Sequence, residues 1–200
     1  ATKFLCGHSD VTAGALVTDD YDLHRRIAFD QNAEGAGLSP FDAWLLLRGM
    51  KTLSLRVDRQ NESAGKIAEY LSSRPEVVKV YYPGLADHPG RHIHRDQSTG
   101  DGAVISFTTG DVALSRQVVE ATQLFDIAVS FGSIGSTISL PCRMSHASIP
   151  QSLRDRLAPP PDLVRLSVGI EDVDDLIEDL SQAFAMAEVP ENAQSAVCVA

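Results

Sequence analysis

The chain opens with ATKFLCGHSD, residues 1–10, which places a lysine in a loop interrupted by glycine and aspartate. Lys3 follows the hydroxyl of Thr2 and precedes two apolar residues, an uncommon setting for a solvated charge. A lysine amine forms a Schiff base with an aldehyde, and burial favours its reactive neutral form. The Thr2 hydroxyl can hold a phosphate oxygen. By residue chemistry alone, a lysine at such a position is more often a surface charge.

Composition limits the class of protein. The 200 residues are 44% hydrophobic, 22% charged and 6% aromatic, which is ordinary for a globular domain. A formal net charge of -10 at pH 7 argues against a nucleic-acid partner, because phosphate backbones require clustered lysine and arginine. No apolar run approaches the roughly 18 residues of a membrane span. We therefore expect neither a nucleic-acid partner nor a membrane partner.

Cysteine and histidine give no convincing metal-site pattern. Three scattered cysteines are too few for a disulfide framework and indicate reduced thiols in an intracellular protein. Three histidines lie within residues 87–96, and this density suggests a metal site. However, His92 and His94 are two residues apart, so a helix would not point them in the same direction. We expect no metal ion.

Periodicity and chain breakers predict the secondary structure. Helices are expected at residues 21–32, 41–55, 57–71, 112–124 and 171–187. Strands are expected at residues 13–18, 77–82, 103–107, 125–132, 137–141 and 163–169. Ser39-Pro40 has the residue types of a helix start. The helix that follows is apolar around most of its circumference, so we expect it to be buried on most sides. Four acidic residues between 171 and 175 are interpreted as the favourable N-terminus of the last helix.

Arg165 stands out because it lies inside an apolar strand. Alternation places it on one face with Leu163 and Ser167, opposite Val164 and Leu166. A buried guanidinium requires a partner, which is either a protein carboxylate in a salt bridge or a substrate carboxylate held by two parallel bonds. The residues alone leave both explanations open.

The opening motif resembles that of a known family. ATKF at residues 1–4, followed by GHSDV at residues 7–11, is similar to the cofactor-lysine motif of the Cys/Met-metabolism family of pyridoxal 5'-phosphate (PLP) enzymes. In that family the matching lysine carries PLP and the preceding threonine contacts its phosphate. The resemblance implies that Lys3 is both the catalytic and the cofactor-binding residue, and that Thr2 binds the phosphate. The family's second phosphate-binding serine would lie upstream of Ala1.

The resemblance covers residues 1 to about 187 and includes further motifs. They are SPFDAWL (39–45), IAVSFGS (127–133), SLPC (139–142), MSHASIP (144–150) and LVRLSVGIEDV (163–173). Within the family, these motifs look closest to the plant- and fungal-type cystathionine β-lyases. The family's arginine at the position of Arg165 binds the substrate α-carboxylate, and its serine at Ser130 lies beside that carboxylate. The resemblance therefore implies that Arg165 and Ser130 bind substrate.

Two positions bear on the choice of substrate. Val129 falls where the γ-acting enzymes of the family commonly carry an acidic residue, so an apolar residue there favours β-lyase-like or methionine-γ-lyase-like behaviour. We take Val129 as a third substrate-binding residue. Gly135 departs from the family pattern, which usually has a charged residue there.

The resemblance implies an α/β protein with the fold type I of PLP-dependent transferases. Residues 1–58 would form the end of the large PLP-binding domain and its connecting helix. Residues 59–188 would form a smaller α+β domain with a mainly antiparallel sheet flanked by helices, and residues 189–200 a flexible tail. The family's other PLP-binding residues precede the lysine, so the expected partners include a missing N-terminal portion of the same enzyme. A homo-oligomer, dimer or tetramer, is also expected.

The implied function is that of a PLP-dependent carbon–sulfur lyase of transsulfuration and methionine biosynthesis. It would act on cystathionine or a related thioether amino acid and release homocysteine, pyruvate and ammonia. The first alternative is a cystathionine γ-synthase, a cystathionine γ-lyase or a methionine γ-lyase. The second is a non-catalytic interaction module. We expect a cytoplasmic protein, with an upstream organellar targeting segment as the alternative.

Overall fold

A computed structural model describes residues 1–144 and 158–187. The expected tail at residues 189–200 and most of the MSHASIP motif lie outside the described residues. The chain divides into two compact units, Ala1–Ser54 and Leu55–Ala200.

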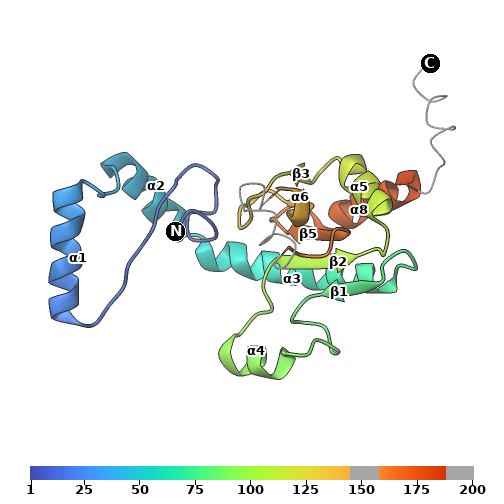
Figure 1. Ribbon diagram of the computed structural model, residues 1–200, viewed down its shortest axis with the longest axis horizontal. Helices are drawn as coiled ribbons and strands as arrows, with labels where there is room; N and C mark the ends of the chain where they lie inside the picture. Colours follow the sequence, from blue (N-terminus) through green and yellow to red (C-terminus); the bar gives the residue numbers. More distant parts are fainter. Residues whose placement is uncertain (145–157, 188–200) are drawn as a thin grey trace, which may run out of the picture. The chain divides into compact units, whose positions relative to one another are not determined.

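The first unit contains a loop and two helices, α1 (Tyr21–Glu34) and α2 (Pro40–Met50) (Figure 1). Asp20 caps α1 by accepting a hydrogen bond from the Leu23 amide at 2.9 Å. Gly35 ends the helix in the left-handed conformation, with φ 72°. Ser39 caps α2 in the same way as Asp20 caps α1, which confirms the predicted helix start.

Two expectations for this unit are wrong. Residues 13–18 form no strand, and Val17 is 95% exposed. A strand is stabilised by pairing, and the described part of this unit offers it no neighbouring strand. The expected burial of α2 also fails, because Phe41 and Leu47 are more than half exposed and only Gly49 of this helix is buried. Trp44 is more than half exposed as well, so much of the apolar surface of α2 is left uncovered within this unit.

The second unit is built on a five-stranded sheet with the order β1-β2-β5-β4-β3. The strands are β1 (Lys79–Tyr81), β2 (Val104–Thr108), β3 (Asp126–Ile127), β4 (Thr137–Ser139) and β5 (Leu163–Ser167). All neighbours are antiparallel except β3 and β4, which are parallel, and this confirms the expected mainly antiparallel sheet. The predicted strand at 125–132 is shorter than expected: β3 ends at Ile127, although the Ala128 amide still donates to the Ile138 carbonyl at 3.1 Å.

The helices of this unit precede, connect or follow its strands (Figure 1). They are α3 (Leu53–Ser73), α4 (Arg91–Gln97), α5 (Val112–Ala121), α6 (Pro141–Met144) and α8 (Val173–Ala187). The long helices α3, α5 and α8 each contribute buried side chains to one hydrophobic core. The rings of Phe107 in β2 and Phe184 in α8 lie 6.0 Å apart in that core. Burial of these apolar side chains is the main stabilisation of the unit.

The two faces of the sheet differ in chemistry. Ile105 pairs with Leu166, and Phe107 pairs with Val164, so these four fully buried side chains share the inner face. The alternate positions form the other face, where Arg165 is paired with Ser106 of β2 and with Ser139 of β4. We call this second face the polar face. It brings Arg165 to the side of the sheet opposite the core.

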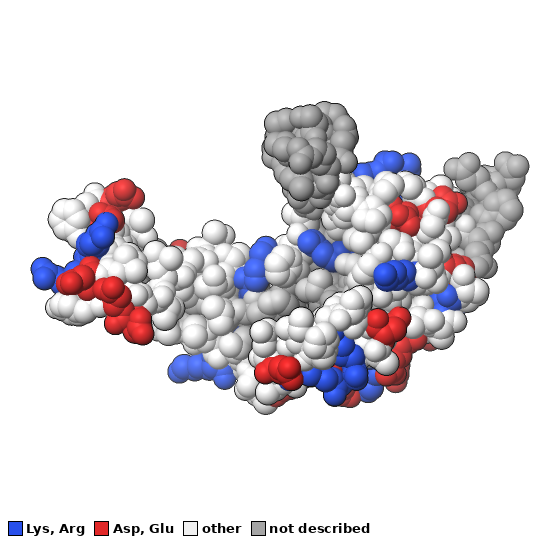
Figure 2. Space-filling model, turned by 60° about the horizontal axis from the view of Figure 1, so that its bottom comes forward, with Lys and Arg blue, Asp and Glu red and all other residues white. Residues whose placement is uncertain are grey.

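On the face drawn in Figure 2, acidic and basic side chains lie intermixed. Over residues 1–144 and 158–187, no helix has both the length and the apolar composition that crossing a membrane would require.

Candidate active site

Lys3 lies in a tight turn formed by residues 2–6. The Gly7 amide donates to the Lys3 carbonyl at 2.8 Å, and the Cys6 amide donates to the Ala1 carbonyl at 3.1 Å. Gly7 has φ 76°, a conformation that glycine adopts without strain. The side chain of Lys3 is half-buried. The backbone on the C-terminal side of the lysine is therefore held by short-range hydrogen bonds.

The hydroxyl of Thr2 connects this turn to the following segment. It accepts a hydrogen bond from the Ala13 amide at 2.9 Å and donates to the Ala13 carbonyl at 3.2 Å. A hydroxyl has one proton and two lone pairs. Thr2 can therefore donate to a phosphate oxygen after its proton rotates away from the Ala13 carbonyl. The amine of Lys3 and the hydroxyl of Thr2 are the groups that an aldehyde bearing a phosphate requires.

Helix α2 lies directly against the lysine turn. A Cβ atom added at Gly49 would collide with the Cys6 carbonyl, so only glycine fits at this position of the helix. Cys6 itself is fully buried, and its thiol donates to Asp10 Oδ1 at 2.9 Å. Sequence reasoning missed Gly49, although a glycine inside an otherwise apolar helix is a known signal of close packing.

Arg165 is the central charged group of the second unit. Its Nη2 donates to the Val129 carbonyl at 2.7 Å, and its guanidinium lies 5.5 Å from the centre of the Phe131 ring. Burial lowers the pKa of the guanidinium, which nevertheless remains protonated at neutral pH. Of the carboxylates in the described residues, none forms a salt bridge with it. The salt-bridge explanation therefore has no support within that part of the chain.

The loop after β3 carries the other two predicted substrate-binding residues. Val129 is 53% exposed, and its carbonyl is the acceptor for Arg165. The Ser130 carbonyl accepts a hydrogen bond from Thr137 Oγ1 at 3.0 Å. The structure thus gathers Val129, Ser130 and Arg165 in the second unit, and it places Thr2 and Lys3 together in the first.

Three side chains that sequence reasoning missed hold the rest of this loop. The Ser167 hydroxyl accepts from the Gly132 amide at 2.9 Å. Gln60 Nε2 donates to the Ser133 carbonyl at 2.7 Å. Glu171 accepts from both the amide and the hydroxyl of Ser136. The acidic cluster does mark the start of α8, where Asp172 accepts from the Asp174 amide at 2.9 Å and Asp174 and Asp175 lie in the first turn. Glu171 alone differs, because it precedes the helix and its carboxylate binds the loop.

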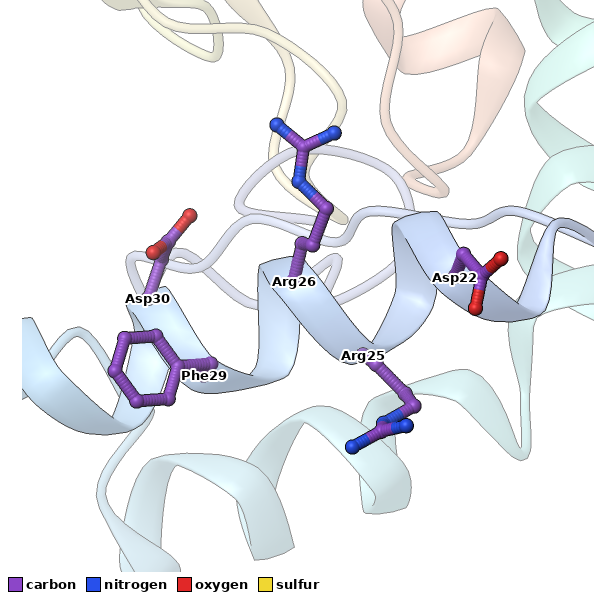
Figure 3. A pocket seen from close by; sticks show the side chains of 5 residues that line it. All are labelled: Asp22, Arg25, Arg26, Phe29 and Asp30. Atoms are coloured by element: carbon purple, nitrogen blue, oxygen red, sulfur yellow. The ribbon is translucent and has the colours of Figure 1, made fainter.

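Two other groups of polar side chains do not form a comparable site. A surface hollow on α1 is lined by Asp22, Arg25, Arg26, Phe29 and Asp30, whose side chains point to different sides of the helix (Figure 3). In the histidine-rich segment, His94 Nε2 lies 2.9 Å from the Gly100 carbonyl and 3.6 Å from Asp101 Oδ1. Within the described ranges, no three metal-ligating side chains gather at one point.

The amino-acid sequence of this chain is similar to those of known enzymes. The family described as Cys/Met metabolism PLP-dependent enzyme matches residues 1–185. Chloroplastic cystathionine beta-lyase of Arabidopsis thaliana is 60% identical over 184 residues, which cover 92% of this chain and 40% of that protein. Cystathionine beta-lyase of Neurospora crassa is 52% identical over 186 residues, covering 93% of this chain and 40% of that protein.

The fold of this chain is also similar to that of a solved structure. Cystathionine gamma-lyase from Lactobacillus plantarum, complexed with L-serine, superposes with a TM-score of 0.89 at 42% identity. The match covers 94% of this chain and 50% of that one. The fold is that of the C-terminal part of fold type I PLP-dependent enzymes. The chain belongs to the family of Cys/Met metabolism PLP-dependent enzymes, and it spans about 40% of the length of the two curated relatives above.

Proposed function

We propose that the complete protein is a PLP-dependent carbon–sulfur lyase that cleaves cystathionine by β-elimination. The products are homocysteine, pyruvate and ammonia. The observation that carries this proposal is the polar face of the sheet, where the Arg165 guanidinium bonds the backbone of an apolar residue, Val129. A guanidinium in this setting suits a substrate carboxylate. The similarity to two cystathionine beta-lyases favours this reaction among those of the family.

The proposal assigns the chain to the C-terminal part of a larger catalytic assembly. Residues 1–58 belong to the PLP-binding domain and its connecting helix, and residues 59–188 form the small domain. The remaining PLP-binding groups come from an N-terminal portion of the same enzyme, and the working form is a homo-oligomer, either a dimer or a tetramer. Its compartment is the cytoplasm, with a plastid as the alternative because the Arabidopsis relative is named chloroplastic.

Lys3 has two roles in the proposed mechanism. Its amine would hold PLP covalently, and the Thr2 hydroxyl would donate to the cofactor phosphate. When bound, PLP supplies an electron sink for the bond electrons left on Cα. The released amine of Lys3 then acts as a general base and removes the Cα proton. Because the same residue holds the cofactor and moves the proton, its substitution removes both functions.

The second unit binds and orients the substrate. Arg165 grips the α-carboxylate with the N–H groups that do not bond Val129, and Ser130 lies beside that carboxylate. Holding the carboxylate restricts rotation of the substrate, so proton removal gains from orientation as well as from affinity. The Cβ–S bond then breaks with its electron pair on sulfur, and the electrons of the former Cα–H bond form a Cα=Cβ double bond. Sulfur takes up the proton that Lys3 removed, and homocysteine leaves. Water hydrolyses the remaining three-carbon fragment to pyruvate and ammonia.

Val129 contributes to substrate choice by offering an apolar surface to the distal part of the thioether. A γ-acting enzyme of the same family is the alternative, because this chain also superposes on a cystathionine gamma-lyase. Product analysis separates the two: pyruvate with homocysteine identifies β-elimination, whereas 2-oxobutyrate identifies γ-elimination.

The first experiment is a visible absorbance spectrum of the protein at its full natural length, with added PLP. We expect an absorbance band of bound cofactor that disappears in Lys3→Ala and persists in Lys51→Ala, which removes an exposed lysine of the same unit. Pyruvate release from cystathionine is then measured for both variants. Absence of the band in the unsubstituted protein would refute the enzyme and leave the non-catalytic interaction module.

A further inference from the structure

The loop of residues 129–136 departs from regular structure but is bonded along most of its length. Arg165 binds its Val129 carbonyl, and Ser167 binds its Gly132 amide. The Ile170 amide donates to the carbonyl of Ile134 at 2.9 Å. The partners come from β5 and from the segment that follows it. We call residues 129–136 the clamp loop, because its Val129 carbonyl bonds the guanidinium and Ser130 is the next residue along the loop.

Gln60 reaches the clamp loop from α3, 73 residues away in sequence. Its side chain is fully buried, and its Nε2 donates to the Ser133 carbonyl at 2.7 Å. Its Oε1 is buried without a hydrogen-bond partner among the described residues. A buried polar atom without a partner destabilises the fold, and leucine would fill a similar volume without this cost. Fold stability therefore does not account for a glutamine at position 60. The hydrogen bond from its side-chain amide to the Ser133 carbonyl does.

Glu171 holds the other end of the clamp loop. Its carboxylate accepts from the Ser136 amide at 2.6 Å and from the Ser136 hydroxyl at 2.9 Å. The same hydroxyl accepts from the Gly169 amide at 2.8 Å. A Cβ atom at Gly169 would collide with the Ile134 carbonyl and with the Glu171 carboxylate. The end of the clamp loop thus packs closely against Gly169. Gly135, in contrast, faces open space, because a Cβ atom there would meet nothing within 4 Å.

We propose that Gln60 and Glu171 are positioning residues for substrate recognition, which fix the clamp loop so that Ser130 and Val129 stay in register with Arg165. Neither residue touches substrate. Each acts through the backbone of the loop, Gln60 at Ser133 and Glu171 at Ser136. This inference rests on the proposed function for its substrate, but the order of the loop can be measured without any activity.

The decisive variant is Gln60→Leu, with Gln97→Leu as its matched control at an exposed glutamine. Hydrogen–deuterium exchange at residues 129–136 is measured by mass spectrometry on the full-length holoenzyme, beside its thermal stability. We expect exchange in the clamp loop to accelerate about tenfold in Gln60→Leu, as loss of one net hydrogen bond implies, with unchanged or higher thermal stability. The apparent affinity for cystathionine should fall by a similar, roughly tenfold, factor.

A second pair of variants tests the Glu171 end. Gly169→Ala forces the loop away from Glu171, whereas Gly135→Ala adds the same methyl group in open space. We expect weaker cystathionine binding in Gly169→Ala alone. Should that variant fold poorly, Ser136→Ala removes one of the two bonds to Glu171 and is expected to have the same effect, at a smaller size.

Each outcome decides one step of the inference. Unchanged loop exchange in Gln60→Leu would show that this residue does not hold the loop. Faster exchange with unchanged cystathionine affinity would show that the loop does not position substrate groups. Lower thermal stability together with unchanged exchange would assign Gln60 a purely structural role. If the unsubstituted holoenzyme bound no cystathionine, the proposed function would fail, while the exchange result would still decide whether Gln60 orders the loop.

Discussion

The two units support their predicted site residues in different ways. In Ala1–Ser54, Lys3 sits in a turn held by backbone hydrogen bonds and by the close approach of Gly49 to Cys6. In Leu55–Ala200, Arg165 projects from a strand whose opposite face is a continuous hydrophobic core. The guanidinium is therefore positioned by the hydrophobic core beneath its strand, and the lysine by the hydrogen bonds of its turn together with the single contact between Gly49 and Cys6. This difference predicts which substitutions disturb each half of the proposed site.

The largest effect is expected from the core of the second unit. Phe107→Ala removes a fully buried ring and should lower the free energy of unfolding by about 3–5 kcal/mol. Phe29→Ala, at a phenylalanine of α1 that is 71% exposed, should change it by less than about 0.5 kcal/mol. Urea unfolding of both variants checks this. Equal losses would contradict the contrast between the two units.

Alkaline pH should weaken the second unit through Tyr82. Burial, followed by the negative charge of Asp101, raises the pKa of Tyr82 to about 12. Its contribution to stability is complete below pH 10, the ordinary tyrosine pKa, and is lost as the pH rises toward 12, because the unfolded phenol ionises first. The loss approaches about 2.5 kcal/mol. Urea unfolding from pH 9 to 12 should show it in the unsubstituted protein and not in Tyr82→Phe.

The lysine turn should respond to a single methyl group. Gly49→Ala places a Cβ atom against the Cys6 carbonyl and should cost about 1–3 kcal/mol, although alanine normally favours a helix. PLP affinity should fall with it, because the turn that carries Lys3 is displaced. Gly37→Ala, where a Cβ atom meets nothing within 4 Å, is the control. Titration of PLP against both variants measures the effect, and equal affinities would refute the role of this contact.

The smallest effect concerns the cap of α1. Asp20→Ala removes the acceptor for the Leu23 amide and should destabilise this helix by about 1 kcal/mol. Hydrogen exchange of the first-turn amides of α1 measures the change, with Asp19→Ala as the neighbouring control. Because α1 contributes no buried residue, unfolding of the second unit should stay unchanged. A shared loss would show that the units unfold together.

Local signals in the sequence predicted much of the fold. Ser39 and Pro40 mark the start of α2, and the apolar periodicity of residues 171–187 predicted α8 nearly in full. These signals succeed because caps, breakers and amphipathic periods act over a few residues. The mainly antiparallel sheet followed from the family resemblance, since strand order depends on partners distant in sequence.

The errors share one physical cause. Burial of α2 and pairing of residues 13–18 depend on what covers them, and no local pattern contains that information. Glu171 was grouped with the acidic N-terminus of α8 because the helix dipole favours carboxylates there, whereas its partner Ser136 lies 35 residues away. Gln60 was missed for the same reason, because its partner Ser133 lies 73 residues away in the sequence. For Lys3 and Arg165, residue chemistry suggested the functional groups, but only the resemblance favoured them over a surface charge and a salt bridge.

The register of β5 has a consequence for how substrate preference changes in evolution. Arg165 is paired with Ser106 on one side and Ser139 on the other, so its place along the sheet is fixed by two ladders. A strand moves only in whole-residue steps of about 3.3 Å, and a single step would turn Arg165 toward the core. The guanidinium is thus a fixed reference point. If Arg165 binds the substrate as proposed, finer adjustment to a longer or shorter amino acid falls to the clamp loop, where a Cβ atom at Gly135 meets nothing within 4 Å.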